Sequence, residues 1–145
     1  MEKKILFVCR GNVARSQIAK SFLKKFTGID ADSAGTEVFD EEGSSVGDVP
    51  AAQPIIRLMR EDEGIDISQQ RRRQITPEMI KKYDKIITMA EPEFSPDYLK
   101  NCPKAEYWPI KDPVKMDDKE IREIISQIKS RVLEFIDKNK IKKVI

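Results

Sequence analysis

The residues with the clearest capacity for chemistry lie together near the start of the chain. They occupy one stretch with the pattern Cys-x5-Arg-Ser, namely Val8-Cys9-Arg10-Gly11-Asn12-Val13-Ala14-Arg15-Ser16. A cysteine thiolate is a strong nucleophile, and the planar fork of an arginine fits two oxygens of a tetrahedral oxyanion. We therefore interpret Cys9 as a candidate nucleophile and Arg15 as a candidate ligand for a phosphate-like group.

This stretch lies between an expected strand and an expected helix, where a backbone can bind an anion. A helix N-terminus presents unpaired N–H groups and the positive end of the helix dipole. Gly11 and Asn12 can adopt positive φ angles, which lets the loop turn further N–H groups inward as a nest. The same field stabilises a thiolate at Cys9, to which Ser16 can donate a hydrogen bond. We predict that the oxyanion is bound by Arg10, Gly11, Asn12, Val13, Ala14, Arg15 and Ser16.

The composition excludes several other kinds of site. The 145 residues include no histidine, which excludes a Ser-His-Asp triad, a Cys-His pair, a histidine metal site and a phosphohistidine. Two cysteines, Cys9 and Cys102, are too few for a thiolate zinc site or a disulfide scaffold. We therefore expect no metal and no cofactor. The formal net charge of +2 gives no electrostatic reason to expect a nucleic-acid partner. The three arginines at 71–73 are expected to be solvated or salt-bridged rather than to guide phosphorylated substrates.

Apolar periodicity indicates which elements position the loop. Residues 5–8 form a continuous apolar run typical of a strand buried on both faces. Residues 16–26 repeat apolar side chains at helical spacing, and Gly28 can end that helix. Asp117 and Glu120 fit a capping box at the start of a long final helix. The other expected elements are strands at 29–34, 84–90 and 106–108, a long loop at 35–50, and helices at 52–63, from 76 and at 93–100.

Strands alternating with helices predict an α/β fold. We expect a three-layer αβα arrangement with a four-stranded parallel sheet and the phosphate loop after the first strand. Right-handed crossovers bring the strand ends to one edge, where ligands of such folds bind. No repeat, low-complexity segment or linker divides the sequence, so residues 1–145 are expected to form a single domain. The absence of a signal peptide or membrane-spanning run predicts a cytoplasmic protein without a membrane partner, with both thiols reduced.

The first loop resembles that of the low-molecular-weight protein tyrosine phosphatases and the related thioredoxin-coupled arsenate reductases. The resemblance extends in order across nearly the whole chain. The further matching segments are Ser33-Ala34-Gly35-Thr36, Gly64-Ile65-Asp66, Arg73-Gln74-Ile75-Thr76, Asp84 to Met89, and Trp108-Pro109-Ile110-Lys111-Asp112-Pro113. The resemblance implies one domain of this family.

Asp112 is the candidate general acid. It follows the last expected strand, so it should reach the same sheet edge as Cys9. A phenolate leaves poorly without a proton donor. In the family that the chain resembles, the aspartate of the Asp-Pro pair is this acid, and Pro113 would stiffen the loop. Asp117 and Asp118 are alternatives, although the helix cap already accounts for Asp117.

Two positions depart from the phosphatase pattern. Val114 stands where many members carry a tyrosine that lines the pocket, which weakens the implied preference for phosphotyrosine. Ala14 stands where many carry a second cysteine, so the loop lacks a thiol that could protect Cys9 in a disulfide. Phe39 is either one wall of the pocket, as aromatics there are in the family, or an anchor of its loop. Arg10 either adds charge at the mouth of the site or faces water.

The main interpretation is a metal-independent cysteine phosphatase that acts through a cysteinyl-phosphate intermediate. Cys9 attacks phosphorus, the loop amides and Arg15 hold the oxygens, and Asp112 protonates the leaving group. The expected partners are a phosphorylated protein, carrying phosphotyrosine, or a small phosphomonoester, and inorganic phosphate or another oxyanion.

Two alternatives stay open. The first is arsenate reduction with an external thiol, because Gln17 after Arg-Ser resembles the reductases. Their internal relay is not expected here, since its first cysteine falls near Ala90. Cys102 is expected at the opposite sheet edge from Cys9, roughly 15–20 Å away, beyond disulfide reach. The second alternative is a non-catalytic module that binds phosphate or phosphopeptides without turnover.

Overall fold

The centre of the structure is a four-stranded parallel sheet. The computed structural model describes residues 3–145, and its strands are β1 (Ile5–Cys9), β2 (Asp32–Gly35), β3 (Lys85–Thr88) and β4 (Ala105–Tyr107). Their order in the sheet is β2-β1-β3-β4, with every pair parallel. The chain thus leaves β1 on one side to form β2 and returns on the other side to form β3. The strand order therefore reverses at the C-terminal end of β1, which is where ligands of open α/β sheets bind.

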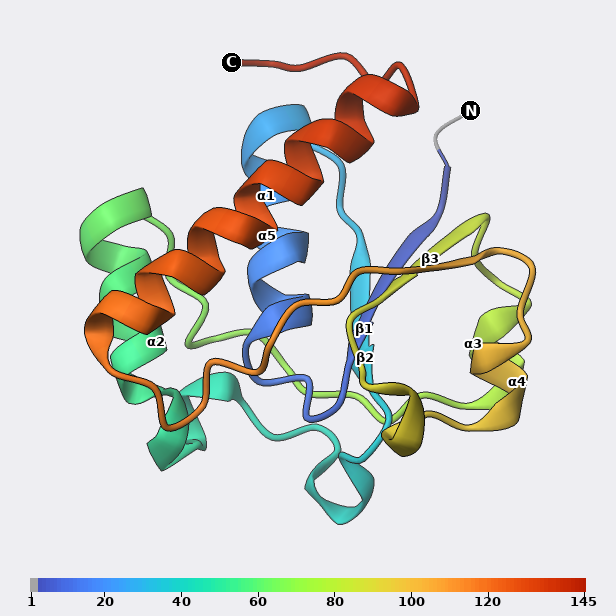
Figure 1. Ribbon diagram of the computed structural model, residues 1–145, viewed down its shortest axis with the longest axis horizontal. Coiled ribbons are helices and arrows are strands. Elements are labelled where there is room, and N and C mark those ends of the chain that lie inside the picture. Colours follow the sequence, from blue (N-terminus) through green and yellow to red (C-terminus); the bar gives the residue numbers. More distant parts are fainter. Residues whose placement is uncertain (1–2) are drawn as a thin grey trace.

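Helices cover both faces of this sheet, as expected for a three-layer αβα fold (Figure 1). One layer contains α1 (Arg15–Thr27), α2 (Gln53–Leu58) and α5 (Asp118–Lys138), and the other contains α3 (Pro77–Ile80) and α4 (Asp97–Lys100). Alternate residues of β1 pack against the two helical layers, because successive strand side chains point to opposite faces. Phe7 belongs to the cluster formed with α1, α2 and α5, whereas Leu6 and Val8 belong to the cluster formed with α3 and α4. This two-sided burial explains why the run of β1 is continuously apolar.

The ends of the principal helices follow the expected local signals. Gly28 ends α1 with a φ of 77°, and Gly64 ends the helical segment after α2 with a φ of 67°. Both lie in the left-handed region that favours glycine. At the start of α5, Asp117 Oδ1 accepts a bond from Glu120 N at 2.8 Å, and Glu120 Oε1 accepts one from Asp117 N at 3.2 Å. The predicted capping box is therefore confirmed.

Several boundaries differ from those expected. The strands expected at 29–34, 84–90 and 106–108 are instead at 32–35, 85–88 and 105–107, since strands extend only as far as their neighbours pair with them. The helix expected over 52–63 is α-helical to Leu58 and continues as a π-helical turn, Met59–Glu63. The helix expected over 93–100 is split into a 3₁₀ turn, Pro92–Phe94, and α4, because Pro96 holds Ser95 extended. The long loop contains 3₁₀ turns at Phe39–Glu41, Val46–Asp48 and Pro50–Ala52.

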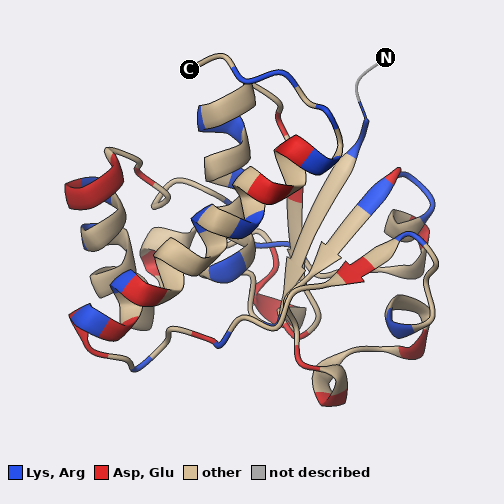
Figure 2. Ribbon diagram, turned by 45° about the horizontal axis from the view of Figure 1, so that its top comes forward, with Lys and Arg blue, Asp and Glu red and all other residues tan. Residues whose placement is uncertain are grey.

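Charged residues of both signs are spread along α5 (Figure 2). Ion pairs also join separate elements. Arg57 of α2 donates to Asp118 of α5 at 2.8 Å, and Arg122 of α5 donates to Asp62 at 2.7 Å. These exposed pairs each add little stability in water. No helix within residues 3–145 has the length and apolar character needed to cross a lipid bilayer.

Candidate active site

The Cys-x5-Arg-Ser loop lies at the predicted sheet edge. Cys9 is the last residue of β1 and is buried, residues 10–14 form the loop, and Arg15 and Ser16 begin α1. The positive φ of the loop falls on Asn12, at 53°, and Gly11 does not share it. Of the two residues expected to be able to adopt this conformation, Asn12 does so, and its short polar side chain tolerates it.

Backbone carbonyl groups of the loop are hydrogen-bonded, whereas its backbone N–H groups are not bonded to any of the described residues. The N–H groups of residues 10–14 have no acceptor within residues 3–145. The carbonyl groups, in contrast, accept bonds from outside the loop: Cys9 from Thr36 N at 3.0 Å, Arg10 from Glu37 N at 2.8 Å, Gly11 from Arg72 Nε at 3.1 Å and Asn12 from Gln17 Nε2 at 3.0 Å. The C=O and N–H of a trans peptide point in opposite directions, so these four carbonyls turn the N–H groups of residues 10–13 inward. Unpaired N–H groups inside a protein are rare, and a run of them makes an anion-binding nest.

A chain of side-chain hydrogen bonds ends on the Cys9 sulfur. Asn12 Oδ1 accepts a bond from Arg73 N at 2.8 Å, so the amide nitrogen of Asn12 is the group that faces Ser16, with 2.7 Å between Nδ2 and Oγ. A hydroxyl carries one proton. Since Ser16 Oγ accepts from Asn12, that proton is available to the Cys9 Sγ, 3.0 Å away. The predicted contact between Ser16 and the thiol is thus present, and Asn12 orients it.

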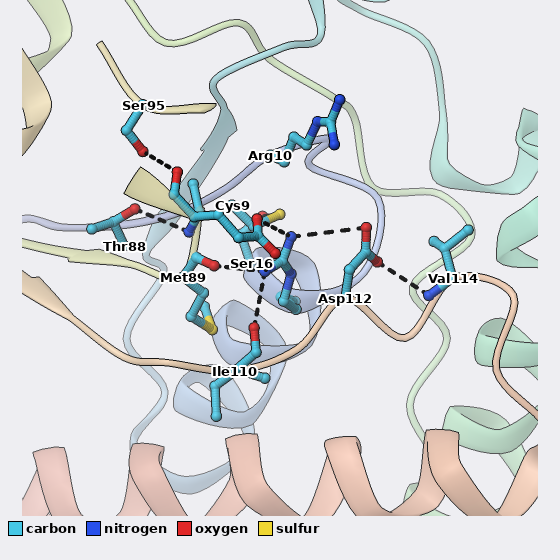
Figure 3. A network of polar contacts seen from close by, with 12 residues as sticks. Cys9, Arg10, Ser16, Thr88, Met89, Ser95, Ile110, Asp112 and Val114 are labelled. Carbon is cyan, nitrogen blue, oxygen red and sulfur yellow. Dashed lines mark hydrogen bonds and ion pairs between the residues drawn. The ribbon is translucent and has the colours of Figure 1, made fainter. Parts of the chain in front are cut away.

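Arg15 is almost completely buried, with 1% of its surface exposed. Its Nη1 donates to the carbonyl oxygens of Met89 at 2.6 Å and Ile110 at 2.9 Å, which hold the guanidinium between the chain after β3 and the chain after β4 (Figure 3). Glu91 contacts both terminal nitrogens, at 3.2 Å and 3.4 Å. The Nε atom has no acceptor within residues 3–145, so this edge of the fork is free for an oxyanion. A buried guanidinium needs such partners, because an unpaired buried charge is costly.

Asp112 lies at the same site, 103 residues after Cys9 in the sequence. Its Oδ2 is 3.9 Å from Nη2 of Arg15, and its Oδ1 accepts a bond from Val114 N at 3.1 Å (Figure 3). The side chain is 44% exposed. A carboxyl group that is fixed beside Arg15 and open to water can exchange a proton with a leaving group or with a water molecule. Asp117 and Asp118, the alternatives, are engaged with the α5 cap and with Arg57.

The rim of the site carries Arg10 and the aromatic residue Phe94. The Arg10 guanidinium stacks over the Phe94 ring, with 3.6 Å from Cζ to the ring centroid, and its Nε donates to Glu37 Oε1 at 2.8 Å. The Arg10 side chain is thus held by Phe94 and Glu37 while 44% of it remains exposed. Phe39 is 63% exposed, with a φ of 52°. It has no anchoring role in the core.

The segment 70–74 supports the loop from outside. Gln17 Nε2 also donates to Arg71 O at 3.0 Å, and Gly35 N donates to Arg73 O at 2.8 Å. The three arginines were expected to be solvated or salt-bridged, and Arg72 is salt-bridged, to Glu41, with only 6% of its surface exposed. The arginine is buried because it donates to the Gly11 carbonyl.

Three residues of the site were not predicted from the sequence. Glu91 could have been proposed from its place just after β3, at the ligand edge of the sheet. Gly35 is required because a Cβ there would lie 2.7 Å from Arg10 O and 2.9 Å from Asn12 N. Arg72 carries no local signal that distinguishes it from Arg71 and Arg73.

The second cysteine lies apart from this site. Cys102 precedes β4 and packs with the α3 and α4 layer, whereas Cys9 packs with the α1 and α5 layer. Both are free thiols. Among residues 3–145, no cluster of three or more His, Cys, Asp or Glu side chains is arranged to hold a metal ion.

This chain is similar in sequence and fold to low molecular weight phosphatases and arsenate reductases. The family model for low molecular weight phosphotyrosine protein phosphatases matches residues 4–144. An arsenate reductase of Bacillus licheniformis is 33% identical over 127 residues, covering 82% of this chain and 80% of that protein. A solved arsenate reductase in its phosphate-binding state is 32% identical, with a TM-score of 0.71 and coverage of 94% and 98%. Vibrio vulnificus Wzb in complex with benzylphosphonate has the same fold, with a TM-score of 0.75, 21% identity and coverage of 94% and 98%.

Proposed function

This chain belongs to the low molecular weight phosphotyrosine protein phosphatase family, and we propose that it hydrolyses phosphomonoesters through a cysteinyl-phosphate. The observation that carries the proposal is the set of five consecutive N–H groups, residues 10–14, that have no acceptor within residues 3–145. They lie next to a buried thiol, a buried arginine and an accessible carboxyl group. This arrangement supplies a nucleophile, ligands for three phosphoryl oxygens and a proton donor.

In the first step, the loop N–H groups and the free edge of Arg15 hold the non-bridging oxygens of the substrate. Cys9 Sγ attacks phosphorus, so a P–S bond forms as the bond from phosphorus to the leaving oxygen breaks. Asp112 gives its proton to that oxygen, and the alcohol or phenol departs. Proton transfer of this kind contributes about 10²–10⁴-fold to rate.

In the second step, a water molecule attacks the phosphorus of the intermediate. Asp112, now a carboxylate, takes a proton from that water, and the P–S bond breaks to release inorganic phosphate. The electron pair returns to the Cys9 sulfur, where the Ser16 hydroxyl stabilises the thiolate. Asp112 is again protonated, and the enzyme has returned to its starting state.

We propose protein phosphotyrosine as the substrate class, with small phosphomonoesters also accepted. The family description supports this assignment, while Val114 in place of the family's usual tyrosine argues for a pocket less specialised for an aromatic ring. We also propose that the protein acts in the cytoplasm, where Cys9 stays reduced.

The test is release of p-nitrophenol from p-nitrophenyl phosphate in metal-free buffer. Wild type should turn over, Cys9→Ser should be inactive, and Asp112→Asn should lose about 10²–10⁴-fold in kcat. Asp118→Asn is the matched control, since that carboxylate pairs with Arg57 outside the site, and it should keep wild-type turnover. A wild-type protein that binds inorganic phosphate but does not release p-nitrophenol would overturn the proposal.

The second candidate function is arsenate reduction with an external thiol, because the similar curated proteins are arsenate reductases. In that reaction Cys9 displaces a hydroxyl group from arsenate to form a sulfur–arsenic bond. An external thiol then attacks the Cys9 sulfur, the bonding pair passes to arsenic, and arsenite leaves. A second external thiol reduces the resulting mixed disulfide. Arsenite formation with glutathione, lost in Cys9→Ser, would favour this function over hydrolysis.

A further inference from the structure

Arg72 is a buried charged residue that touches the oxyanion-binding loop from behind. Its Nε donates to the Gly11 carbonyl oxygen at 3.1 Å, and its Nη1 contacts the Glu41 carboxylate and lies 3.5 Å from Ser44 Oγ. The side chain lies 57 positions beyond Arg15 in the sequence and takes no part in the proposed chemistry. A buried arginine is costly unless its charge is paired and its N–H groups are hydrogen-bonded. Here the partners of Arg72 belong to the oxyanion-binding loop and to a second loop.

The contact with Gly11 determines where one N–H group of the nest points. The Gly11 carbonyl and the Asn12 N–H belong to the same planar peptide and point in opposite directions. Backbone donors from Thr36 and Glu37 fix the preceding two carbonyls. The Gly11 carbonyl is held instead by a charged side chain, so the orientation of the Asn12 N–H depends on Arg72.

Arg72 is itself fixed by the loop of residues 36–45. Its backbone N–H donates to Ser44 O at 2.8 Å, and its carbonyl accepts a bond from Gly43 N at 2.7 Å. Glu41, in the 3₁₀ turn of the same loop, balances the charge of the guanidinium. The loop 36–45 and the oxyanion-binding loop are therefore joined through one side chain.

We propose that Arg72 is a positioning residue for oxyanion binding: by fixing the Gly11–Asn12 peptide, it aims the Asn12 N–H at the bound group. The proposal deepens the proposed function and depends on it only in requiring that the loop binds a phosphate-like anion. It applies equally to hydrolysis and to arsenate reduction.

The test is titration of the ¹⁵N-labelled protein with inorganic phosphate, followed by the amide resonances of residues 10–14. Arg72→Gln removes the charge, and Arg72→Lys keeps one donor for the Gly11 carbonyl. Arg71→Gln is the matched control: among residues 3–145, its guanidinium donates only to Gly43 O and makes no hydrogen bond to the oxyanion-binding loop. Glu41→Gln is a fourth variant, which leaves Arg72 in place but removes its charged anchor.

We expect Arg72→Gln to raise the dissociation constant for phosphate about tenfold, as for the loss of a charge-assisted hydrogen bond, and to abolish the phosphate-induced shift of the Asn12 amide. Arg72→Lys should recover part of the phosphate affinity and part of the Asn12 shift. Arg71→Gln should match wild type in both measurements. If Arg72→Gln does not fold, Glu41→Gln tests the same proposal. We expect Glu41→Gln to raise the dissociation constant for phosphate severalfold. Unchanged affinity and an unchanged Asn12 shift in folded Arg72→Gln or Glu41→Gln would overturn this inference alone. Loss of turnover with wild-type phosphate binding intact would overturn only the proposed function.

Discussion

At the scale of single residues, the direction of each hydrogen bond decides what the Cys9 sulfur meets. Arg73 N can only donate, so it fixes the Asn12 amide, which in turn makes Ser16 an acceptor on one side and a donor on the other. Sequence reasoning correctly placed Ser16 near the thiol from its position at the helix start. It missed the orienting role of Asn12, because that role depends on a backbone group 61 residues away.

Ser16→Ala should therefore slow the reaction of Cys9 with iodoacetamide at mildly acidic pH. The hydroxyl proton stabilises the thiolate, which is the reactive form, and alanine cannot supply it. Peptide mass spectrometry can follow the alkylation of both cysteines in the same sample. Cys102 serves as an internal control, since it lies in the other layer and its alkylation rate should not change. Equal rates at Cys9 in wild type and Ser16→Ala would contradict the inferred direction of this bond.

At the scale of elements, the strand and helix pattern was accessible from the sequence, and the contacts between elements were not. The apolar runs of β1 and β3 and the apolar stripe of α5 are local patterns, which can be read directly from the sequence. The role of Gly35 could not be predicted in this way. Gly35 belongs to β2, and nothing near it in sequence indicates that it must leave room for the loop after β1. That requirement arises only when β1 and β2 pair, with Cys9 beside Gly35.

Gly35→Ala should destabilise the protein and weaken oxyanion binding together. A Cβ at this position would lie 2.7 Å from Arg10 O and from Val38 Cγ2, so the loop must move. Overpacking of this kind costs about 1–3 kcal/mol in the free energy of unfolding. Gly11→Ala is the comparison for stability, because its Cβ would meet only Val13 Cγ2 at 3.6 Å. Urea denaturation should therefore show a larger decrease in the free energy of unfolding for Gly35→Ala than for Gly11→Ala, although Gly11 lies within the loop itself. The opposite order would be inconsistent with this packing.

Tyr83 joins the start of β2 to the turn before β3, and its contribution to stability should depend on alkaline pH. Its hydroxyl donates to Asp32 Oδ2 at 2.6 Å. Burial, together with the hydrogen bond and charge of Asp32, raises the pKa of Tyr83 to about 12, while a free tyrosine titrates near 10. Since the folded pKa is the higher, the stabilisation is complete below about pH 10 and is lost as pH rises towards 12.

The measurement is the free energy of unfolding of wild type and Tyr83→Phe between pH 8 and pH 11.5. Wild type should be more stable by about 1–3 kcal/mol at pH 8, as for a hydrogen bond to a charged group. Phenylalanine does not titrate, so the difference should narrow above pH 10. A difference that stays constant across this range would show that Tyr83 does not titrate with a raised pKa.

At the scale of the whole molecule, the sheet keeps the two thiols apart. Cys9 faces the layer of α1 and α5 at the ligand edge, and Cys102 packs with α3 and α4 before β4 begins. The sequence predicted this separation from element order alone, since Cys102 precedes a strand and Cys9 ends one. The resemblance to the family implies further cysteines at Ala14 and near Ala90, and this chain has alanine at both positions. No thiol of this chain can therefore capture an oxidised Cys9 without large rearrangement of the fold.

Limited exposure to hydrogen peroxide should consequently oxidise Cys9 without forming a bond to Cys102. The first product is a sulfenic acid, which a thiol can reduce, and further oxidation to sulfinic and sulfonic acids is irreversible. Non-reducing peptide mapping should find oxygen added to the Cys9 peptide, and glutathione present during exposure should convert it to a mixed disulfide that dithiothreitol reverses. Cys102→Ser should change neither result, because it supplies no resolving thiol. A Cys9–Cys102 disulfide in wild type would show that the layers open far enough for an internal relay, and it would strengthen the case for arsenate reduction over hydrolysis.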